Sequence, residues 1–292
     1  MTFDNLSRGH VESVKWGPFV KGDILDSRAV GEALALYKPQ ALIHFAALAY
    51  VGESVEQPLS YYETNVAGLF NILKAMREHT IDTIVFSSSC ATYGIPEAVP
   101  VKEDAPQRPI SPYGRSKLMG EWVLMDSAAA YGIRYAILRY FNACGADPDG
   151  ELSECHEPET HLIPLAIDAA NGKAPPLNVF GADYSTPDGT CERGYVQVSD
   201  LADAHVAALK YLASGGPSAR LNIGTGRAHS VFEVLRVVEE VVGRPVPHHI
   251  APRRPGDPPT VLADPSAAEN LLDFRTRYSD LRTIVRTAAQ MR

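Results

Sequence analysis

The chain has 292 residues, of which 45% are apolar and 21% are charged, an ordinary globular composition. Its net charge of −8 disfavours a nucleic-acid or anionic-membrane surface, because either partner would repel it. No apolar run approaches the roughly 18 residues that span a bilayer, and the first residues lack a basic segment followed by an apolar one. We therefore expect a soluble cytoplasmic protein that acts on a small molecule and binds neither nucleic acid nor membrane.

The chain opens with a short apolar stretch that ends at Asp4. In dinucleotide-binding sheets, an acidic residue at the end of the second strand binds a ribose, about 20 residues after a Gly-rich phosphate turn. No such turn precedes Asp4. We therefore expect a Rossmann-like sheet whose first strand, Gly-rich turn and first helix are missing, either because the true start lies upstream or because the chain is truncated.

Three apolar runs, at residues 41–45, 83–86 and 135–140, alternate with helix-length amphipathic stretches at 66–78 and 117–131. This alternation predicts an α/β fold with a doubly wound parallel sheet. Such sheets bind their ligands outside the carboxyl ends of the strands.

After residue 142 the chain becomes rich in Pro and Gly turns, with two helical stretches at 198–213 and 231–242. We expect a Rossmann-like domain over residues 1–141. Residues 142–292 should form a smaller C-terminal substrate lobe, with some segments returning to the first domain.

The strand at 83–86 runs into three serines, Ser87 to Ser89, and about 24 residues later come Tyr113 and Lys117. The tyrosine and the lysine are four residues apart at a predicted helix start, so they share one helix face. A free tyrosine titrates near pH 10, but an adjacent ammonium favours the phenolate. The pair alone is weak evidence, but its position one crossover after a serine-rich strand end favours a catalytic base.

This combination resembles the extended branch of the short-chain dehydrogenase/reductase family, whose members use such a Ser, Tyr and Lys around a nicotinamide cofactor. The chain resembles the 4-epimerases of UDP-sugars in this family from end to end. The segments that carry the likeness are DNLSRG at 4–9, GDI at 22–24, HFAA at 44–47, VGES at 51–54, YYETNV at 61–66, RYFN at 139–142, FGADY at 180–184 and APRRPGD at 251–257.

The resemblance implies interconversion of UDP-glucose and UDP-galactose through a transient 4-keto sugar, with tightly bound NAD. Ser89 and Tyr113 would meet the sugar 4-hydroxyl, and Lys117 would tune the tyrosine. The implied cofactor-binding residues are Asp4, Asn5, Leu6, Ser7, Asp23, Ile24, Phe45, Ala46, Ala47, Leu48, Asn65, Ser87, Tyr113, Lys117, Tyr140 and Phe141. The implied substrate-binding residues are Ser89, Asn142, Leu162, Asn178, Val179, Phe180, Arg193, Arg254 and Asp257.

Several alternatives stay open. Sugar-nucleotide dehydratases of the family place an acidic pair where this chain has Cys90-Ala91-Thr92, so elimination is disfavoured, whereas a UDP-arabinose epimerase remains possible. Val261 occupies the position that gates bulky sugars in relatives, and its small size leads us to expect UDP-N-acetylglucosamine as well. A hypothesis from another functional class is a non-catalytic relative that binds sugar nucleotides without the cofactor. Ala49, Gly194 and Gln197 depart from the common pattern, and the last two are expected to weaken the support of Arg193.

No metal site is expected. Cys155, His156, Glu157 and His161 collect potential ligands, but no matching second pair follows, so we interpret the segment as a polar loop. The resemblance also implies a homodimer through the helices at 66–78 and 117–131.

Overall fold

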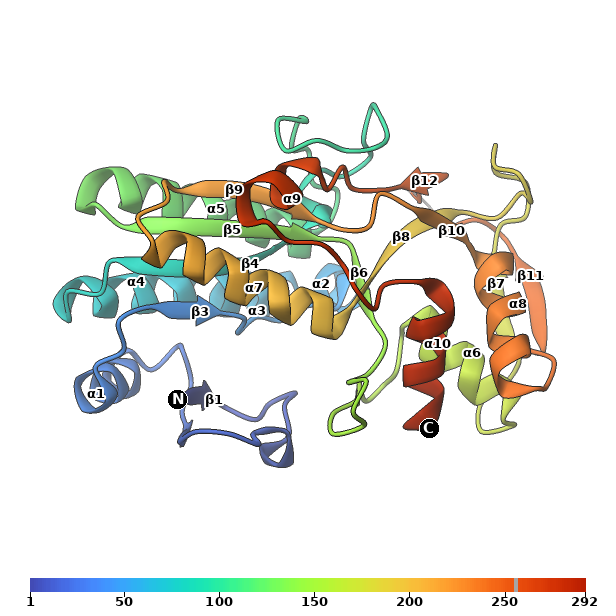
Figure 1. The fold of residues 1–292 in the computed structure, drawn as a ribbon, viewed down its shortest axis with the longest axis horizontal. Coiled ribbons are helices and arrows are strands. Elements are labelled where there is room, and N and C mark those ends of the chain that lie inside the picture. Colours follow the sequence, from blue (N-terminus) through green and yellow to red (C-terminus); the bar gives the residue numbers. More distant parts are fainter. Residues whose placement is uncertain (255–256) are drawn as a thin grey trace. The chain divides into compact units, whose positions relative to one another are not determined.

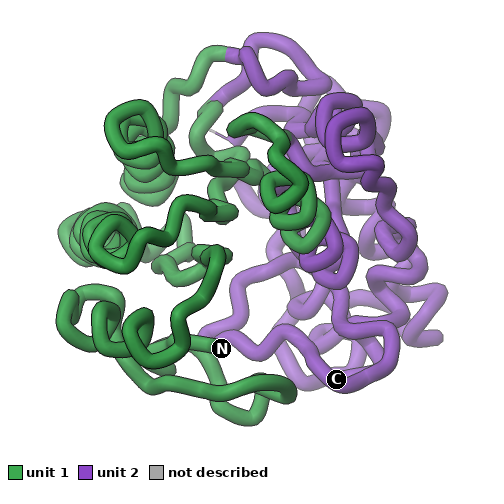
Figure 2. Tube along the Cα trace, turned by 60° about the vertical axis from the view of Figure 1, so that its left-hand side comes forward, with its two compact units in different colours: residues 1–94, 106–139, 205–221 green, residues 95–105, 140–204, 222–292 purple. Residues whose placement is uncertain are grey.

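A computed structural model describes residues 1–254 and 257–292. The chain folds as two compact units, which are described separately (Figure 2). Unit 1 comprises residues 1–94, 106–139 and 205–221, and unit 2 comprises residues 95–105, 140–204 and 222–292.

A four-stranded sheet with the order β3-β4-β5-β9 forms the centre of unit 1. Figure 1 shows α4 and α5 on one face of this sheet and α7 on the other. The strands are β3 (Leu42–His44), β4 (Thr83–Ser89), β5 (Arg134–Tyr140) and β9 (Ala219–Ile223). Every residue of β4 is buried, as is typical of a parallel strand that is covered on both faces. The predicted doubly wound fold and its three strands are therefore confirmed.

A second, two-stranded parallel sheet pairs β1 (Thr2–Asp4) with β2 (Phe19–Lys21). Among residues 1–254 and 257–292, β1 pairs with no other strand and β3 pairs only with β4. Within the described residues, the two sheets of unit 1 are therefore not joined by strand pairing.

The helices of unit 1 connect the strands in chain order and enclose one apolar core. Leu69, Met76, Ile84, Leu124 and Ile137 are fully buried members of that core. The helical segments are η1 (Val11–Ser13), α1 (Ser27–Tyr37), α2 (Val51–Glu56), α3 (Pro58–Tyr62), the π-helical η2 (Glu63–Ala67), α4 (Gly68–Glu78), η3 (Cys90–Thr92) and α5 (Pro112–Tyr131). The helix α7 (Val198–Ala213) begins in unit 2 and ends in unit 1.

In unit 2, β8 is the central strand and pairs with β6, β10 and β12, while β7 pairs in parallel with β11. The helices α6, α8 and α10 pack around a second apolar core that includes Ile167, Val234 and Ile284. The strands are β6 (Asn142–Cys144), β7 (Leu177–Phe180), β8 (Glu192–Gln197), β10 (Ala228–Ser230), β11 (His248–Ala251) and β12 (Thr260–Val261). The helices are α6 (Leu162–Ala170), α8 (Val231–Val242), α9 (Ser266–Leu272) and α10 (Leu281–Gln290).

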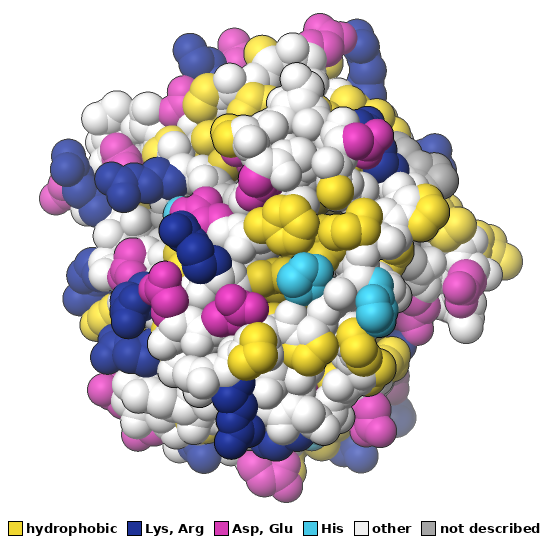
Figure 3. All heavy atoms as spheres, turned by 90° about the vertical axis from the view of Figure 1, so that its right-hand side faces the viewer, with side chains coloured by type: hydrophobic (Ala, Val, Ile, Leu, Met, Phe, Trp, Pro, Cys, Tyr) yellow, Lys and Arg dark blue, Asp and Glu magenta, His cyan; other side chains and the backbone are white. Residues whose placement is uncertain are grey.

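None of the helices within the described residues combines the length and the hydropathy needed to cross a bilayer. On the face of the molecule shown in Figure 3, acidic and basic side chains are interspersed with apolar ones.

Candidate active site

The three serines at the end of β4 have three different partners in unit 1. The hydroxyl oxygen of Ser87 lies 3.0 Å from Nε2 of His205 on α7. Ser88 donates a hydrogen bond to the carboxylate of Glu121 on α5. Ser89 caps the turn η3 by accepting a hydrogen bond of 3.2 Å from the backbone N–H of Ala91. Successive side chains of a strand point to opposite faces, so the middle serine faces a different helix from its neighbour at 87.

The helix α5 starts where the sequence places the catalytic pair. Ser111 caps it by accepting a hydrogen bond from the N–H of Gly114, and Pro112 occupies the first turn, where its missing N–H has no consequence. A Cβ atom at Gly114 would lie 2.5 Å from the carbonyl oxygen of Ala91. Glycine is therefore required there, because the first turn of α5 lies directly against the turn that follows Ser89.

Tyr113 and Lys117 lie one helical turn apart on α5, with only 7% and 4% of their surfaces exposed. The ammonium of Lys117 donates a hydrogen bond of 2.8 Å to the carbonyl oxygen of Ser87 and lies 5.4 Å from the ring centre of Phe86. Burial lowers the pKa of Lys117 to about 8, against an opposite effect of the Glu121 carboxylate. The lysine thus keeps a positive charge near neutral pH within a largely apolar environment, beside the tyrosine of the predicted pair.

A fully buried ion pair lies behind the end of β4. The guanidinium of Arg139 on β5 donates to both carboxylate oxygens of Glu121 at 2.9 and 2.7 Å, and it also donates to the Tyr93 hydroxyl at 2.8 Å. Gln107 donates a further hydrogen bond of 3.0 Å to the same carboxylate. Together with Ser88, these groups give the Glu121 carboxylate four donors, which fixes α5 against β4 and β5.

The predicted ribose-binding loop follows β1. The carboxylate of Asp4 accepts a hydrogen bond of 2.6 Å from the N–H of Leu6, whose backbone has a positive φ of 61°. Asn5 donates a hydrogen bond of 2.9 Å to Asp23. The loop is therefore held by the Asp4 carboxylate from within and by Asp23, which follows β2, and Ser7 at its end is exposed.

A second cluster of predicted cofactor residues follows β3. The side chain of Asn65 accepts from the N–H of Leu48 at 2.8 Å and donates to its carbonyl at 3.0 Å, which pins residues 45–48. The same amide donates to Ser116 on α5 at 2.9 Å. Phe45 is 53% exposed, and its ring centre lies 4.5 Å from that of His205. Unit 1 thus presents an exposed aromatic ring at the carboxyl end of β3.

The other predicted cofactor residues lie partly in the core of unit 1 and partly in unit 2. Ile24 is buried in the apolar core of unit 1, where it packs against Gly68, and its carbonyl accepts a hydrogen bond of 2.9 Å from the Asn71 side chain. Ala46 and Ala47 are half-buried between β3 and α2. Tyr140 ends β5, and both Tyr140 and the buried Phe141 belong to unit 2.

The predicted substrate-binding residues, apart from Ser89, all belong to unit 2. Arg193 on β8 forms an ion pair with Asp257 and donates a hydrogen bond of 2.7 Å to the carbonyl of Glu192. The guanidinium of Arg254 lies 3.9 Å from the ring centre of Phe180 on β7. Both cationic groups are thus held in place by neighbouring side chains. Pro255 and Gly256, which complete the 251–257 segment, lie outside the described residues.

The remaining substrate-binding residues lie on neighbouring strands and a helix start of unit 2. Asn142 on β6 donates a hydrogen bond of 2.9 Å to the carbonyl of Gly194. Leu162 is the first residue of α6, while Asn178 is exposed and Val179 is buried on β7. Gln197, expected to weaken the surroundings of Arg193, is fully buried and donates a hydrogen bond of 2.6 Å to the carbonyl of Ala146.

Sequence reasoning missed His205, Glu121 and Arg139. His205 lies in a helix seven residues after its start and contacts both Ser87 and Phe45 from a distant part of the chain. Glu121 lies four residues after Lys117, on the helix face that carries the predicted pair. This spacing was the one feature of the sequence that could have indicated that Glu121 lies near the site.

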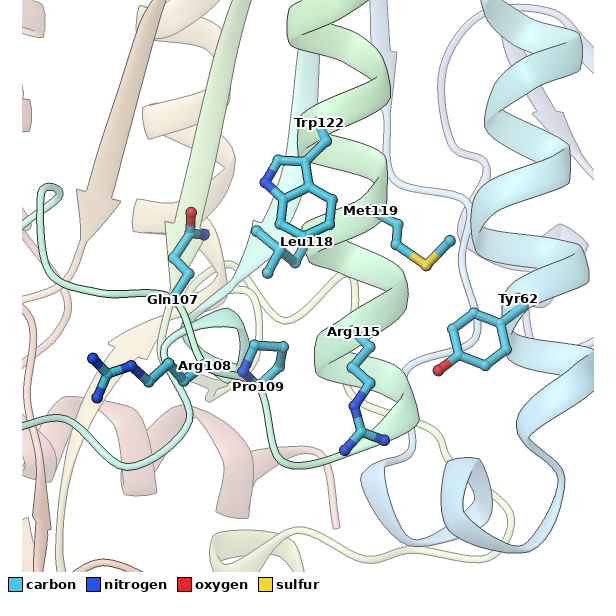
Figure 4. A pocket seen from close by; sticks show the side chains of 8 residues that line it. All are labelled: Tyr62, Gln107, Arg108, Pro109, Arg115, Leu118, Met119 and Trp122. Atoms are coloured by element: carbon cyan, nitrogen blue, oxygen red, sulfur yellow. The ribbon is translucent and has the colours of Figure 1, made fainter.

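The pocket shown in Figure 4 lies elsewhere in unit 1 and has a volume of about 560 Å³. Leu118, Met119 and Trp122 project into it from α5, and Tyr62 borders it from α3. Tyr113, Lys117 and Ser89 are not among its lining residues. This pocket is therefore distinct from the predicted catalytic site.

Comparison with known proteins identifies the family. Residues 2–224 match the NAD dependent epimerase/dehydratase family. The chain is 50% identical to the UDP-glucose 4-epimerase of Rhizobium leguminosarum bv. trifolii, over 99% of this chain and 88% of that protein. It is 54% identical to a UDP-glucose 4-epimerase from Brucella ovis in a crystal structure with NAD, with a TM-score of 0.97 over 99% of this chain and 89% of that one. A UDP-Glc/GlcNAc 4-epimerase from Campylobacter jejuni is 38% identical, with a TM-score of 0.86 over 99% of this chain and 90% of that one. The chain belongs to the NAD dependent epimerase/dehydratase family.

Proposed function

We propose that the chain is a UDP-glucose 4-epimerase, an isomerase that interconverts UDP-glucose and UDP-galactose through a 4-keto sugar. The observation that carries the proposal is the buried Tyr113 and Lys117 on α5, packed through Gly114 against the turn that follows Ser89. The relatives that are about half identical over nearly the whole chain are named for this activity.

The residues of unit 1 fit the NAD that the family implies. Asp4 offers a carboxylate at the carboxyl end of β1, where a ribose hydroxyl would bind. The exposed ring of Phe45 offers an apolar surface, and the buried ammonium of Lys117 is placed to donate to a ribose. When bound, NAD supplies the reversible acceptance of hydride from the sugar C4. We propose that residues 1–141 hold this cofactor and that residues 142–292 mostly hold the UDP-sugar.

The chemistry of the chain's own residues then follows from their positions. Tyr113, beside the Lys117 charge, removes the proton of the sugar 4-hydroxyl as its phenolate and later returns it. Ser89 holds the same sugar oxygen by a hydrogen bond. Lys117 stays fixed during the cycle because the Ser87 carbonyl holds its ammonium at 2.8 Å.

Arg193 and Arg254 would bind the diphosphate of the substrate, since a guanidinium bonds phosphate oxygens bidentately. Tight binding at the nucleotide leaves the sugar free to present either face. Epimerisation requires this freedom, because hydrogen must return to the opposite side of the same carbon.

The decisive test replaces Tyr113 by phenylalanine. Loss of the base should lower turnover by a factor of about 10² to 10⁴, with little change in KM, in a coupled assay of UDP-galactose conversion. Tyr37→Phe, at the exposed end of α1, is the matched control and should keep wild-type turnover. NAD released from the denatured protein should be measured in parallel. A Tyr113→Phe protein that turns over within threefold of wild type would refute the proposal, and a protein without NAD would favour the non-catalytic relative.

UDP-N-acetylglucosamine is a second candidate substrate. Val261 on β12, which falls at the position that gates bulky sugars in relatives, has a small and half-buried side chain. The Campylobacter jejuni relative is named for both glucose and N-acetylglucosamine substrates. Val261→Tyr should therefore abolish turnover of the acetylated sugar and spare that of UDP-glucose. Wild-type turnover of the acetylated sugar below a hundredth of the UDP-glucose rate would contradict this assignment.

We also propose a homodimer formed through α4 and α5, and a cytoplasmic location. The outer faces of these helices carry exposed apolar side chains, among them Phe70, Met119 and Trp122. Trp122 is 53% exposed and borders the pocket of Figure 4. Exposed aromatic residues next to an apolar hollow are typical of protein interfaces. Fractionation of the native cells would test the location.

A further inference from the structure

Four side chains of unit 2 bring metal-binding atoms together in the loop before α6. They are Glu154, His156, Glu159 and His161, called the His-Glu cluster below, and their closest ligand atoms all lie within 4.8 Å of one another. The sequence predicted a polar loop here because no second ligand pair follows His156 and His161. The structure supplies that pair from within the same eight residues, as the two glutamate carboxylates.

The spacing within the cluster suits a single ion. The Nδ1 atom of His156 lies 3.0 Å from the Glu154 carboxylate and 3.7 Å from that of Glu159. The Nδ1 atom of His161 lies 3.6 Å from the Glu159 carboxylate and forms a short contact with Glu154. Bonds of about 2.0 to 2.1 Å at tetrahedral angles separate two ligand atoms by about 3.4 Å. The separations between His and Glu atoms lie on both sides of that value, and the widest spacing in the cluster, up to 4.8 Å, would have to shorten for all four atoms to bind one ion.

The two imidazole rings converge on the same carboxylates rather than each having its own. Their centres lie 5.1 Å apart in a T-shaped arrangement, so both Nδ1 atoms point to one region. Two imidazole nitrogens and two carboxylates that converge in this way could bind one divalent cation, whose charge would balance both carboxylates. The side chains of Glu154 and Glu159 are only 14% and 10% exposed, whereas those of His156 and His161 are 30% and 49% exposed, so the carboxylates are shielded and the histidines face solvent.

We propose that the His-Glu cluster binds one divalent transition-metal ion, for which zinc is the best match. Two imidazole nitrogens disfavour magnesium and calcium, which prefer oxygen ligands. Four protein ligands and no open position are typical of a structural zinc site rather than a catalytic one.

The surroundings of the cluster support a structural role. The second oxygen of the Glu159 carboxylate accepts a hydrogen bond of 2.8 Å from Arg292, which also pairs with Asp168 on α6. The first oxygen accepts hydrogen bonds from the N–H groups of Thr160 and His161 at 2.8 and 3.0 Å. Outer partners of this kind orient metal ligands. The ion would therefore fasten residues 154–161 to the start of α6 and to the last residue of the chain.

The test measures zinc binding by the full chain. The protein is purified without a histidine tag, stripped with a chelator and titrated with Zn²⁺ alone by calorimetry. We expect one equivalent at micromolar affinity or tighter, a higher midpoint of thermal unfolding with zinc, and intense visible absorption when Co²⁺ replaces Zn²⁺. His156→Ala and the nearly isosteric Glu154→Gln should each weaken binding at least about tenfold.

Two controls separate the cluster from other ligands. Cys155→Ser removes an exposed thiol in the same loop, and His249→Ala removes an exposed imidazole on β11, and both should bind zinc as wild type does. Circular dichroism establishes that each variant is folded. The proposal is overturned if the wild type takes up less than half an equivalent, if Glu154→Gln and His156→Ala bind as tightly as wild type, or if Cys155→Ser abolishes binding.

Discussion

Removing one charge of the buried pair between Glu121 and Arg139 should destabilise unit 1 strongly. Both side chains are fully buried, and the carboxylate receives four hydrogen bonds. In Glu121→Gln, the amide oxygen can accept only about two of these donors, and the amide NH₂ group faces the others. Because arginine does not lose its proton in proteins, its charge would stay buried without a partner.

The expected loss follows from that uncompensated charge. Breaking a buried ion pair by removing one partner costs about 3 to 5 kcal/mol. For a unit of this size, each kcal/mol lowers the unfolding midpoint by about 2 to 4 °C, so Glu121→Gln should lower it by roughly 6 to 20 °C. Arg139→Met should cost less, because Glu121 keeps the donors Ser88 and Gln107.

Thermal unfolding followed by circular dichroism, with urea titration of the same proteins, measures both losses. The double variant Glu121→Gln/Arg139→Met lacks both charges of this pair and should recover a large part of the stability lost in Glu121→Gln. A loss below about 2 °C in Glu121→Gln, or strictly additive effects in the double variant, would refute this reasoning.

Three further changes test other parts of the structure. Burial, with a smaller contribution from Lys117, lowers the pKa of His44 to about 3 from 6.5. The unfolded chain therefore binds a proton below pH 6.5 that the folded chain does not, and stability should fall by about 1.4 kcal/mol per pH unit between 6 and 4. His44→Phe should remove this contribution to the dependence of the unfolding free energy on pH. An unchanged urea midpoint between pH 7 and 5 in the wild type would contradict the assignment to His44. Gly114→Ala should lower turnover at least tenfold, since its Cβ meets the Ala91 carbonyl at 2.5 Å, whereas Gly31→Ala on α1 has open space and should be active. Trp122→Glu should give a monomer by light scattering, and a dimer of wild-type affinity would exclude the proposed interface.

Much of the fold could be predicted because its signals are local. The helices at 198–213 and 231–242 have the predicted bounds, and the stretch predicted at 117–131 is part of a helix that already begins at Pro112, so that it includes Tyr113. The run at 66–78 was predicted less well, because helical structure already starts at Pro58 and passes through the π-helical segment 63–67 before α4. Periodicity alone does not reveal a change of helix type.

The contacts that support the predicted residues were not predictable in the same way. Arg139 lies within a predicted strand, where a charged side chain is unexpected. Only the fold brings its partners Glu121 and Tyr93, and the further donor Gln107, together from other segments. The His-Glu cluster illustrates the opposite case. All its ligands lie within eight residues, yet their convergence depends on the path of a loop that has no periodic signal.

The serines of β4 show how one local pattern acquires three roles. In the sequence Ser87, Ser88 and Ser89 are equivalent, and only the family resemblance selects the last as the residue that meets the sugar. In the structure, Ser87 faces His205 with its side chain and Lys117 with its carbonyl, while Ser88 faces the buried ion pair. A change of the Ser88 side chain should therefore act first on stability, and a change of the Ser87 side chain on His205. Ser88→Ala should consequently lower the unfolding midpoint, and any loss of turnover should follow from that loss of stability. Ser89→Ala should instead lower turnover while the unfolding midpoint stays unchanged. If both variants lost turnover equally at unchanged stability, the assignment of different partners to the two serines would be wrong.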